Sequence, residues 1–324
     1  MKRIVLLVDP PRKIEYADVS RHDMEGYTPL EAELTRKAIQ EFTPCVMYTN
    51  IKTFMNRLWL HRKDLIFPMI WGRGSRNTRA LLPAVCEARN IAYIGADCYT
   101  HALCLDKFLA KKYAKAFHFN TPNSLMLFRS QTAEEIDRAI HSLNLPLVVK
   151  PNFGGGSCGI SDKNLVDTYE EAAKVINNLF ANQYDPLLVE EYVEGSEISI
   201  LLLGNHTAVD YFGETQLILD EETFFQHRIW GFETKKLDFQ RSHYQVSHLL
   251  PEAELRKAKN LFLSLPKAEC LRVDGRLNER GFFVLELSPD CYLGPKSDFS
   301  ILFEAMGKSH SDFLRYLAEN ALST

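Results

Sequence analysis

The feature that most constrains the fold is the stretch from Leu145 to Glu197, which opens with LPLVVKPNFGGGSCG and closes with LLVEEYVEGSEISI. The opening places Lys150 at the end of an apolar strand, directly before a glycine-rich loop. The closing places acidic residues on both sides of a second apolar strand and its turn. Backbone N–H groups of a glycine loop, together with an ammonium group, are suited to binding phosphates. The stretch therefore predicts two walls of a nucleotide pocket.

The string Gly154-x-Gly156-x-x-Gly159 also matches the dinucleotide-binding fingerprint, but its context differs. A Rossmann loop leads from a strand directly into a helix, and an acidic residue follows about 20 positions later. Here the loop runs into Gly159-Ile160-Ser161, which we predict to be a second strand, and position 179 is leucine. The Walker sequence Gly-Lys-Ser/Thr is absent too. We therefore predict a strand–loop–strand flap that covers phosphates. The alternative is a plain hairpin turn with a surface lysine.

Strands alternate with helices over about the first 100 residues, which predicts a parallel α/β layer. The predicted strands are Ile4–Val8, Cys45–Tyr48, Leu65–Trp71 and Ala92–Gly95, and the predicted helices are Pro29–Phe42 and Arg79–Arg89. Further along, we expect a helix over Tyr99–Phe119, a strand over Leu125–Phe128, and helices over Ala133–Leu143 and Thr168–Phe180.

The loop WGRGSRNTR follows one of these predicted strands and carries Arg73 and Arg76. Ligands of open parallel sheets bind at the carboxyl ends of strands, and arginine forks suit planar anions. Arg73 and Arg76 are therefore candidate substrate-binding residues for a carboxylate or phosphate. A solvated basic turn explains the same arginines equally well.

Composition excludes several classes of function. The 324 residues suffice for two or three domains, and the formal net charge of -4 gives no reason to expect nucleic acid or an anionic membrane as a partner. No apolar run approaches the roughly 20 residues of a membrane-spanning helix. The seven cysteines are scattered and lack C-x-x-C spacing, which argues against a disulfide framework or a zinc site. This cysteine pattern favours a reducing, cytoplasmic location.

The second informative stretch is Cys270–Asp290, which reads as a β-hairpin around Asn278-Glu279-Arg280-Gly281. A three-residue loop with Gly281 in the left-handed conformation would place Asp274 opposite Glu286 and Arg272 opposite Ser288, all on one face. Two opposed carboxylates repel each other unless a divalent cation lies between them. Oxygen ligands at this spacing suit Mg²⁺ carried on ATP phosphates. The alternative is a solvent-exposed hairpin face.

Together these motifs resemble the ATP-grasp superfamily, and within it the D-alanine–D-alanine ligases. The resemblance is strongest from Tyr93 to Ser297. The motifs occur in family order: YIGAD…DK, TP, VVKPNFGGGSCG, VEEYVEGSE, FETKK, RVDGRL and LELSP…S. The resemblance implies an α/β (α+β) ATP-grasp fold with three parts. These are an N-terminal parallel-sheet domain (1–100), a central ATP-grasp subdomain with the glycine-rich flap (101–189) and a C-terminal ATP-grasp subdomain with the metal-binding hairpin (190–324).

The resemblance also implies roles for individual residues. Residues expected to bind ATP are Lys107 and Lys150 at the phosphates, Gly155, Gly156 and Ser157 over the triphosphate, Glu190, Glu191 and Val193 around the adenine, and Glu197 at the ribose. Residues expected to hold one or two Mg²⁺ ions, or Mn²⁺ in their place, are Asp274, Glu286 and Ser288. Residues expected to act in catalysis are Arg272, Lys235 of the lid-like FETKK segment, and Ser297, which also corresponds to the family's substrate-carboxylate serine.

Three departures from the family affect these expectations. The ligases carry Glu-x-Asn where this chain has Glu286-Leu287-Ser288, and a serine hydroxyl is a weaker metal ligand than an amide oxygen. Asp290 lies two residues further on and offers a substitute. The family's glycine-rich first loop is replaced by VDPPRKIEY, and its Gly–Glu–Asp–Gly loop is replaced by WGRGSRNTR. The reaction class therefore transfers better than the substrate.

The resulting hypothesis is an ADP-forming carboxylate–amine ligase that makes an amide through an acylphosphate, acting on an amino acid or a small peptide. No Ser–His–Asp or Cys–His arrangement is recognisable, and Cys158 is interpreted as a small filler. Two alternatives stay open: a nucleotide-binding protein of the same fold with impaired catalysis, and a phosphotransferase acting on a hydroxyl. The expected partners are small-molecule carboxylates and amines. Members of the family often dimerise through the N-terminal domain, and a homodimer is expected by that analogy alone.

Overall fold

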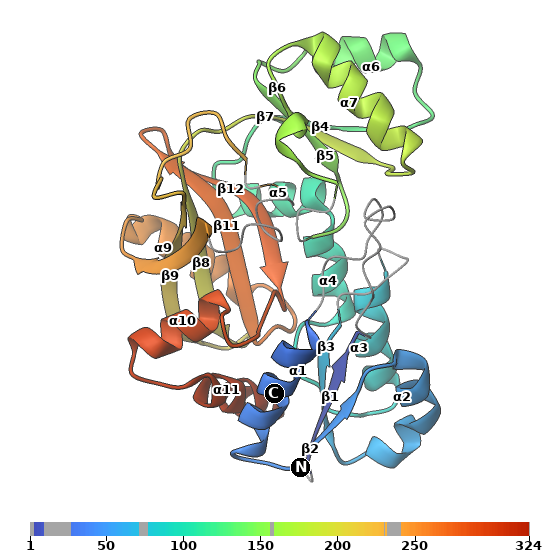
Figure 1. The fold of residues 1–324 in the computed structure, drawn as a ribbon, viewed down its shortest axis with the longest axis vertical. Helices are drawn as coiled ribbons and strands as arrows, with labels where there is room; N and C mark the ends of the chain where they lie inside the picture. The colour runs from blue at the N-terminus through green and yellow to red at the C-terminus, as the bar shows by residue number, and fades with distance from the viewer. Residues whose placement is uncertain are drawn as a thin grey trace.

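The structure of the chain is a computed structural model that describes residues 3–9, 27–70, 77–155, 159–229, 231 and 241–323. Three β-sheets form its framework (Figure 1). None of the helices in these ranges is long and apolar enough to cross a membrane.

The first sheet is parallel and three-stranded, with the order β2-β1-β3. Its strands are β1 (Ile4–Val8), β2 (Cys45–Tyr48) and β3 (Leu65–Met69), and its helices are α1 (Pro29–Gln40), α2 (Ile51–Arg57), η2 (Leu58–His61) and α3 (Thr78–Ala88). Because β1 is buried on both faces, it reads as a continuous apolar run. Its odd-numbered residues pack with α2 and α3, whereas its even-numbered residues pack toward α1, α10 and α11. This layer confirms the predicted parallel α/β arrangement.

The second sheet is antiparallel and four-stranded, with the order β4-β7-β5-β6. Its strands are β4 (Ser124–Leu127), β5 (Leu147–Pro151), β6 (Leu165–Val166) and β7 (Leu187–Glu191). The helices α6 (Ala133–Ile140) and α7 (Tyr169–Ala181) cover one face and share a core with it. Thr132 begins α6 with a capping box to Glu135, which satisfies the first free N–H groups of that helix.

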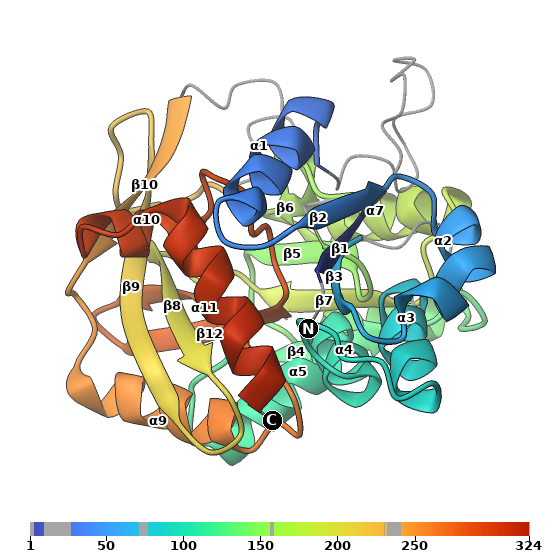
Figure 2. The same cartoon turned by 90° about the horizontal axis from the view of Figure 1, so that it is seen from below.

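The third sheet is antiparallel and five-stranded, with the order β10-β9-β8-β11-β12. Its strands are β8 (Ser196–Gly204), β9 (Val209–Leu219), β10 (Ser242–Ser247), β11 (Cys270–Asn278) and β12 (Gly281–Pro289). On one face lie α4 (Cys98–Leu105), α5 (Lys107–Ala116) and α9 (Glu252–Leu263). On the other face α10 (Asp298–Ala305) and α11 (His310–Ser323) cross β8 and β9 (Figure 2).

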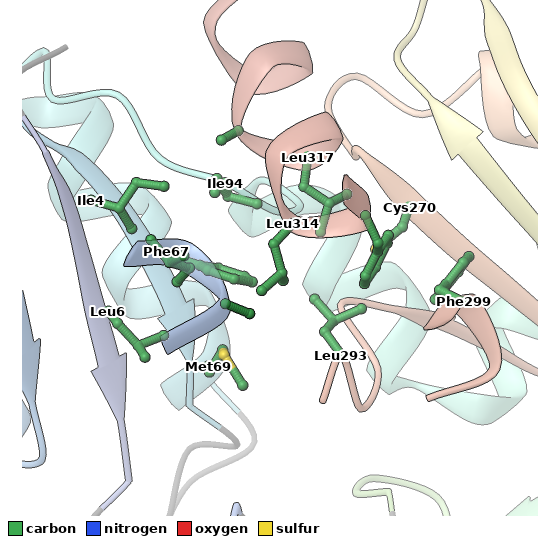
Figure 3. Packing of buried hydrophobic residues seen from close by; sticks show 14 of the residues in the cluster. Ile4, Leu6, Phe67, Met69, Ile94, Cys270, Leu293, Phe299, Leu314 and Leu317 are labelled. Atoms are coloured by element: carbon green, nitrogen blue, oxygen red, sulfur yellow. The ribbon is translucent and has the colours of Figure 1, made fainter. Parts of the chain in front are cut away.

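One apolar cluster joins the N-terminal sheet to the C-terminal helices (Figure 3). Leu6 and Phe67 of the parallel sheet belong to it, as do Phe299 of α10 and Leu314 of α11. Helix α11 also contacts α1 directly. The two ends of the chain are therefore packed together, and this packing fixes the parallel sheet against the five-stranded sheet.

Three predicted elements differ from the structure. Residues Ala92–Gly95 form only an isolated bridge, from Tyr93 to Ile66, instead of a strand. The helix predicted over Tyr99–Phe119 is divided at Asp106, whose extended backbone ends α4 and whose side chain caps α5. A one-turn helix follows the glycine loop at Asp162–Asn164, in place of the strand predicted at Gly159–Ser161. The partner of β5 comes only at Leu165–Val166.

The predicted domain limits, 1–100, 101–189 and 190–324, stay a proposal. They are supported by the three sheets, although β7 continues to Glu191 and so crosses the second limit.

Candidate active site

A cleft of about 900 Å³, counting the part open to solvent, lies between the four-stranded and five-stranded sheets. One wall comes from β5, β7 and the turn after β7, and the other comes from β8, β11 and β12. The lining side chains are Val148, Lys150, Ile160, Glu190, Glu191, Tyr192, Val193, Glu197, Ser199, Ile229, Tyr244, Arg272, Asp274, Gly275, Arg276, Leu285 and Glu286.

A buried ion-pair cluster lies at the wall below the glycine loop. Glu190 of β7 is 3% exposed and is ion-paired with Lys150 of the neighbouring strand. Lys111 of α5 approaches from the other side, with its Nζ 2.9 Å from Glu190 Oε2, and also donates to the Leu285 carbonyl at 2.9 Å. Burial raises the pKa of Glu190, but the charges of Lys111 and Lys150 outweigh it and lower that pKa overall.

Lys111 is 2% exposed, and burial lowers its pKa to about 8. It connects α5, β7 and β12 through one ammonium group.

Lys107 lies beside the start of the glycine loop. As the first residue of α5, its position follows from the break at Asp106. Its ammonium donates to the Gly154 carbonyl and lies 3.4 Å from Glu286 Oε1. Asn152 fixes the loop to this helix, since its side chain accepts from the Phe108 N–H and donates to Asp106, both at 2.9 Å. The structure therefore brings together Lys107, the start of the glycine loop and the β11–β12 hairpin.

Gly155 of the glycine loop is described, whereas Gly156 and Ser157 lie outside the described residues, as do Arg73, Arg76 and Lys235.

The turn after β7 presents its backbone to the cleft. The Glu191 carboxylate faces another way, because it accepts from Asn123 at 2.9 Å and from the Asn144 side chain at 2.8 Å. Only the backbone of Glu191 is thus left for the predicted adenine contact. Val193 lines the cleft, and Glu197 of β8 pairs with Arg276 Nη2 at 3.2 Å.

The hairpin of β11 and β12 has the predicted residue pairing at the site, but its turn and its register differ from the prediction. Asp274 faces Glu286 and Arg272 faces Ser288, as predicted. The turn, however, is a two-residue loop, because Asn278 pairs with Gly281. A β-bulge between Asp274 and Gly275 then shifts the register. The predicted three-residue loop is therefore wrong, and the missed bulge compensates for it.

Asp274 is held by three neighbours. Ser199 donates to its Oδ1 at 2.7 Å, Ser288 donates to its Oδ2 at 3.1 Å, and Arg272 Nε lies 2.7 Å from Oδ1. Burial raises the pKa of Asp274, the Arg272 charge opposes this, and the Glu286 charge adds to it. Among the described residues no three His, Cys, Asp or Glu side chains form a cluster that could hold a metal ion. Asp274 and Glu286 offer carboxylate oxygens, the type of donor that Mg²⁺ takes alongside nucleotide phosphates and water.

Arg272 lies between two carboxylates. Besides Asp274, its Nη1 donates to Asp298 Oδ2 at 2.8 Å, and Thr215 donates to the other oxygen of Asp298 at 2.8 Å. Asp298 and Thr215 are both buried. This pairing fixes the guanidinium at the edge of the cleft, where Tyr244 lies beside it.

Two further candidates are not among the residues that line the cleft. Ser297 is buried and begins α10, where its Oγ accepts from the Ser300 N–H at 3.1 Å. The Asp290 carboxylate accepts from the Ala96 N–H at 2.7 Å and lies 3.1 Å from His101 Nε2. Asp290 therefore does not point toward Asp274 as the suggested substitute metal ligand would.

Sequence reasoning missed Lys111, Asp298 and Arg276. Each acts across elements far apart in the chain, so spacing along the sequence gave no signal for the partners of Asp298 or Arg276. Lys111 had one signal, because it lies four residues after Lys107 and so faces the same side of α5.

Comparisons with known proteins agree with this architecture. The family profile described as "D-ala D-ala ligase C-terminus" matches residues 114–319, more than half of the chain. The D-alanine–D-alanine ligase of Corynebacterium jeikeium is 27% identical over 266 residues, which cover 80% of this chain and 68% of that protein. Among solved structures, the D-alanine–D-alanine ligase of Bacillus anthracis complexed with ATP superposes with a TM-score of 0.72 at 17% identity, covering 99% of this chain and 98% of that one. VanG D-Ala:D-Ser ligase of Enterococcus faecalis gives a TM-score of 0.71 at 19% identity, covering 99% and 100%.

The family profile, on a chain whose cleft lies between two antiparallel sheets with lysines on one wall and opposed carboxylates on the other, identifies an ATP-grasp ligase. This class of enzyme uses ATP to form a C–N bond. The chain belongs to the D-alanine–D-alanine ligase family.

Proposed function

We propose that this enzyme activates the carboxylate of an amino acid or small peptide with ATP and joins it to the amine of a second such molecule. A carboxylate oxygen attacks the γ-phosphorus, and ADP leaves. The amine nitrogen then attacks the acyl carbon, phosphate leaves with the bridging oxygen, and the nitrogen loses a proton. The observation that carries the proposal is the convergence of Lys107, Lys150, Arg272, Asp274 and Glu286 around one cleft.

The lysines have the first role. Lys150 lines the cleft and Lys107 lies beside the Gly154 carbonyl, so phosphates that enter under the loop would lie close to both ammonium groups. In this structure the two ammonium groups are paired with Glu190 and Glu286. Phosphoryl transfer depends mainly on positioning and on neutralising charge. The loop that includes Gly155, Gly156 and Ser157 is proposed to cover the phosphates, and the backbone from Glu190 to Val193, with Glu191 between, to frame the adenine. Glu197 is proposed to accept hydrogen bonds from the ribose.

Asp274 and Glu286, with Ser288 as a third donor, would hold one or two Mg²⁺ ions, with Mn²⁺ as a substitute. A bound Mg²⁺ neutralises phosphate charge and orients the transferring group. Ser288 at present donates to Asp274, so its hydroxyl would have to turn to act as a ligand. We therefore assign the main binding role to the two carboxylates.

Arg272 is proposed to stabilise the oxyanion of the transferring group. Its guanidinium has five N–H donors. Asp274 lies next to Nε, and Asp298 accepts a hydrogen bond from Nη1. Because both partners are carboxylates, the group acts as an oriented donor more than as a net positive charge. Lys235 and Ser297 are kept as proposed catalytic residues from the family resemblance, and Arg73, Arg76 and Ser297 as proposed substrate contacts.

The relatives named above are D-alanine–D-alanine and D-Ala:D-Ser ligases. The substrate class proposed for this chain is accordingly a small amino acid or its peptide, and D-alanine is the first compound to test. The altered first loop, VDPPRKIEY, is the reason for testing a broad panel. A homodimer, a cytoplasmic location and the absence of nucleic acid as a partner stay predictions.

The test is ADP release by the purified protein with Mg-ATP and a panel of D- and L-amino acids and dipeptides, followed by mass spectrometry of the product. The proposal predicts ADP release that depends on two substrates and a product lighter by one water than their sum. A phosphorylated hydroxyl product would instead support the phosphotransferase. ATP binding without ADP release across the panel would support the catalytically impaired protein.

A further inference from the structure

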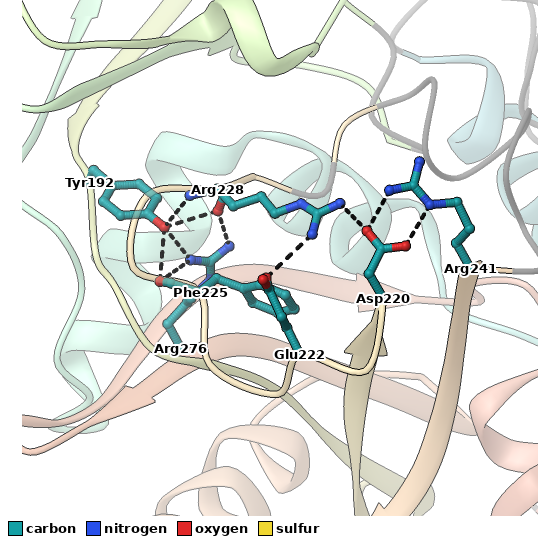
Figure 4. A network of polar contacts seen from close by, with 7 residues as sticks. All are labelled: Tyr192, Asp220, Glu222, Phe225, Arg228, Arg241 and Arg276. Atoms are coloured by element: carbon teal, nitrogen blue, oxygen red, sulfur yellow. Dashed lines mark hydrogen bonds and ion pairs between the residues drawn. The ribbon is translucent and has the colours of Figure 1, made fainter.

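Arg276 is an extensively bonded side chain beside the cleft that the proposed reaction does not use. It lies on β11, two residues after Asp274, and is 3% exposed (Figure 4). Its guanidinium reaches from the five-stranded sheet to the turn after β7, which belongs to the opposite wall of the cleft. One side chain thus connects the metal-binding hairpin to the turn proposed to frame the adenine.

Arg276 holds that turn through backbone and side-chain acceptors. Its Nη1 donates to the Tyr192 hydroxyl at 2.8 Å and to the Val193 carbonyl at 3.3 Å. The guanidinium also lies between two rings, 5.3 Å from the centroid of Tyr192 and 5.2 Å from that of Phe225. A planar cation held between rings and bonded at its edge has little freedom to rotate. The backbone of Val193 is therefore fixed from behind.

The second branch of the guanidinium holds a carboxylate. Arg276 Nη2 lies 3.2 Å from Glu197 Oε2 and donates to the Arg228 carbonyl at 2.9 Å. Glu197 lines the cleft, whereas the guanidinium is buried beneath it. Because one oxygen of Glu197 is paired with the buried guanidinium, the orientation of this carboxylate toward the cleft is restricted.

The same network continues to the segment after β9. Tyr192 exchanges hydrogen bonds with Arg228, whose guanidinium pairs with Asp220 at 2.6 Å. Arg241 binds the same Asp220 carboxylate. The anchor of Arg276 is therefore part of a larger rigid frame and not an isolated surface pair (Figure 4).

We propose that Arg276 is a positioning residue for the nucleotide sugar, fixing Glu197 and the Val193 backbone so that the site selects ribose over deoxyribose. This inference rests on the proposed role of Glu197 at the ribose. A correctly oriented carboxylate gains a charge-assisted hydrogen bond from a sugar hydroxyl, and a nucleotide that lacks the hydroxyl leaves that carboxylate unsatisfied.

The test compares dissociation constants of ATP, 2′-deoxy-ATP and 3′-deoxy-ATP by calorimetry in the wild type and in Arg276→Met, Arg276→Gln and Glu197→Gln. We expect the wild type to prefer ATP over at least one deoxy analogue by about tenfold, because one charge-assisted hydrogen bond is lost. Arg276→Met and Arg276→Gln should reduce this preference to about twofold or less. In Glu197→Gln the preference should be equally small, and adding Arg276→Met should reduce it no further.

Arg280→Met is the matched control, since Arg280 lies exposed at the turn of the same hairpin, 5.2 Å from the Phe283 ring. It should keep the wild-type preference. Arg276→Gln serves if Arg276→Met does not fold, because it keeps amide donors for the carbonyls while removing the charge beside Glu197.

Two results would overturn the inference and can be told apart. A folded Arg276 variant that keeps the wild-type preference, while Glu197→Gln loses it, overturns the role of Arg276 alone. A wild type without any preference, or a Glu197→Gln variant that keeps it, overturns the ribose role of Glu197 in the proposed function and the inference with it.

Discussion

At the residue scale, the buried ammonium of Lys111 makes two contacts at once. It forms an ion pair with Glu190 and donates a hydrogen bond to the Leu285 carbonyl. Lys111→Met would remove both contacts while Glu190 keeps Lys150. Breaking one side of a buried ion pair should lower the free energy of unfolding by about 3 kcal/mol. ATP should also stabilise the variant less than it stabilises the wild type. Urea denaturation with and without ATP measures both effects.

Lys112→Met is the control for Lys111, since the next lysine of α5 is exposed and lies over the Phe108 ring at 4.9 Å. Its unfolding free energy should change by less than about 1 kcal/mol. Equal losses in the two variants would contradict a special role for Lys111.

Asp274 and Ser288, two oxygen donors around the proposed metal site, should differ in how much each contributes to turnover. Asp274→Asn removes a carboxylate that faces Glu286, whereas Ser288→Ala removes a neutral hydroxyl that now donates to Asp274. We expect turnover to fall by about 100-fold or more in Asp274→Asn and by less than about tenfold in Ser288→Ala. Initial rates across a Mg²⁺ titration test this. If Ser288→Ala lost as much activity as Asp274→Asn, the hydroxyl would be an essential ligand.

At the element scale, the hairpin depends on the bulge next to Gly275. A Cβ at this position would lie 2.5 Å from the Phe283 carbonyl oxygen and 2.6 Å from the Phe282 ring, which is fully buried. Gly275→Ala should therefore cost about 2 kcal/mol or more of unfolding free energy and should lower turnover, because Asp274 is the adjacent residue. Denaturation curves and steady-state rates check the two parts.

Gly213→Ala in β9 provides the comparison for Gly275, because the added methyl would meet only the flexible end of Leu302, at 2.6 Å. A rotamer change relieves that contact, so the loss should be clearly smaller. A Gly275→Ala variant as stable and active as Gly213→Ala would mean that the bulge does not position the carboxylates.

The same hairpin shows how far sequence could predict the elements. Alternation along β11 and β12 identified the face that carries Asp274 and Glu286. The predicted length of the hairpin loop was wrong, because the sequence Asn278-Glu279-Arg280-Gly281 suits both a two-residue and a three-residue turn. Gly275 inside the strand was a bulge signal that went unused. The division of the helix at Asp106 and the short β6 depend on tertiary contacts with Asn152 and β5, which local propensity does not encode.

At the scale of the whole molecule, Glu269 joins the N-terminal layer to the five-stranded sheet. It is 1% exposed, accepts from the Gly95 N–H and pairs with Lys267. Burial raises its pKa from 4.5 to about 7, against the Lys267 charge, and Asp290 adds to the rise. The folded state therefore holds this proton where the unfolded state has released it. The stabilisation from this group is complete below pH 4.5 and is lost as the pH rises to about 7.

Glu269→Gln isolates this effect. The difference in unfolding free energy, wild type minus variant, should fall by about 3 kcal/mol between pH 4.5 and 7, since other groups cancel in the difference. A flat difference for Glu269→Gln would contradict the raised pKa. Chemical denaturation across this pH range provides the data.

The overall architecture could be predicted from the order of short motifs in the sequence. The contacts that join the layers could not be predicted in this way. Leu6 and Phe67 could be predicted as core, but not their packing with Phe299 and Leu314, which lie more than 200 residues later in the chain. For the same reason, the pairing of Arg272 with Asp298 and the frame around Arg276 became visible only in three dimensions.

The central claim is that ATP activates a substrate carboxylate as an acylphosphate, and isotope transfer tests it most directly. Once a substrate pair is found, its carboxylate is labelled with ¹⁸O and the released phosphate is analysed by mass spectrometry. The account predicts one labelled oxygen in phosphate for each amide formed, and labelled phosphate released about 100-fold more slowly with Asp274→Asn. Amide formation with unlabelled phosphate would contradict it.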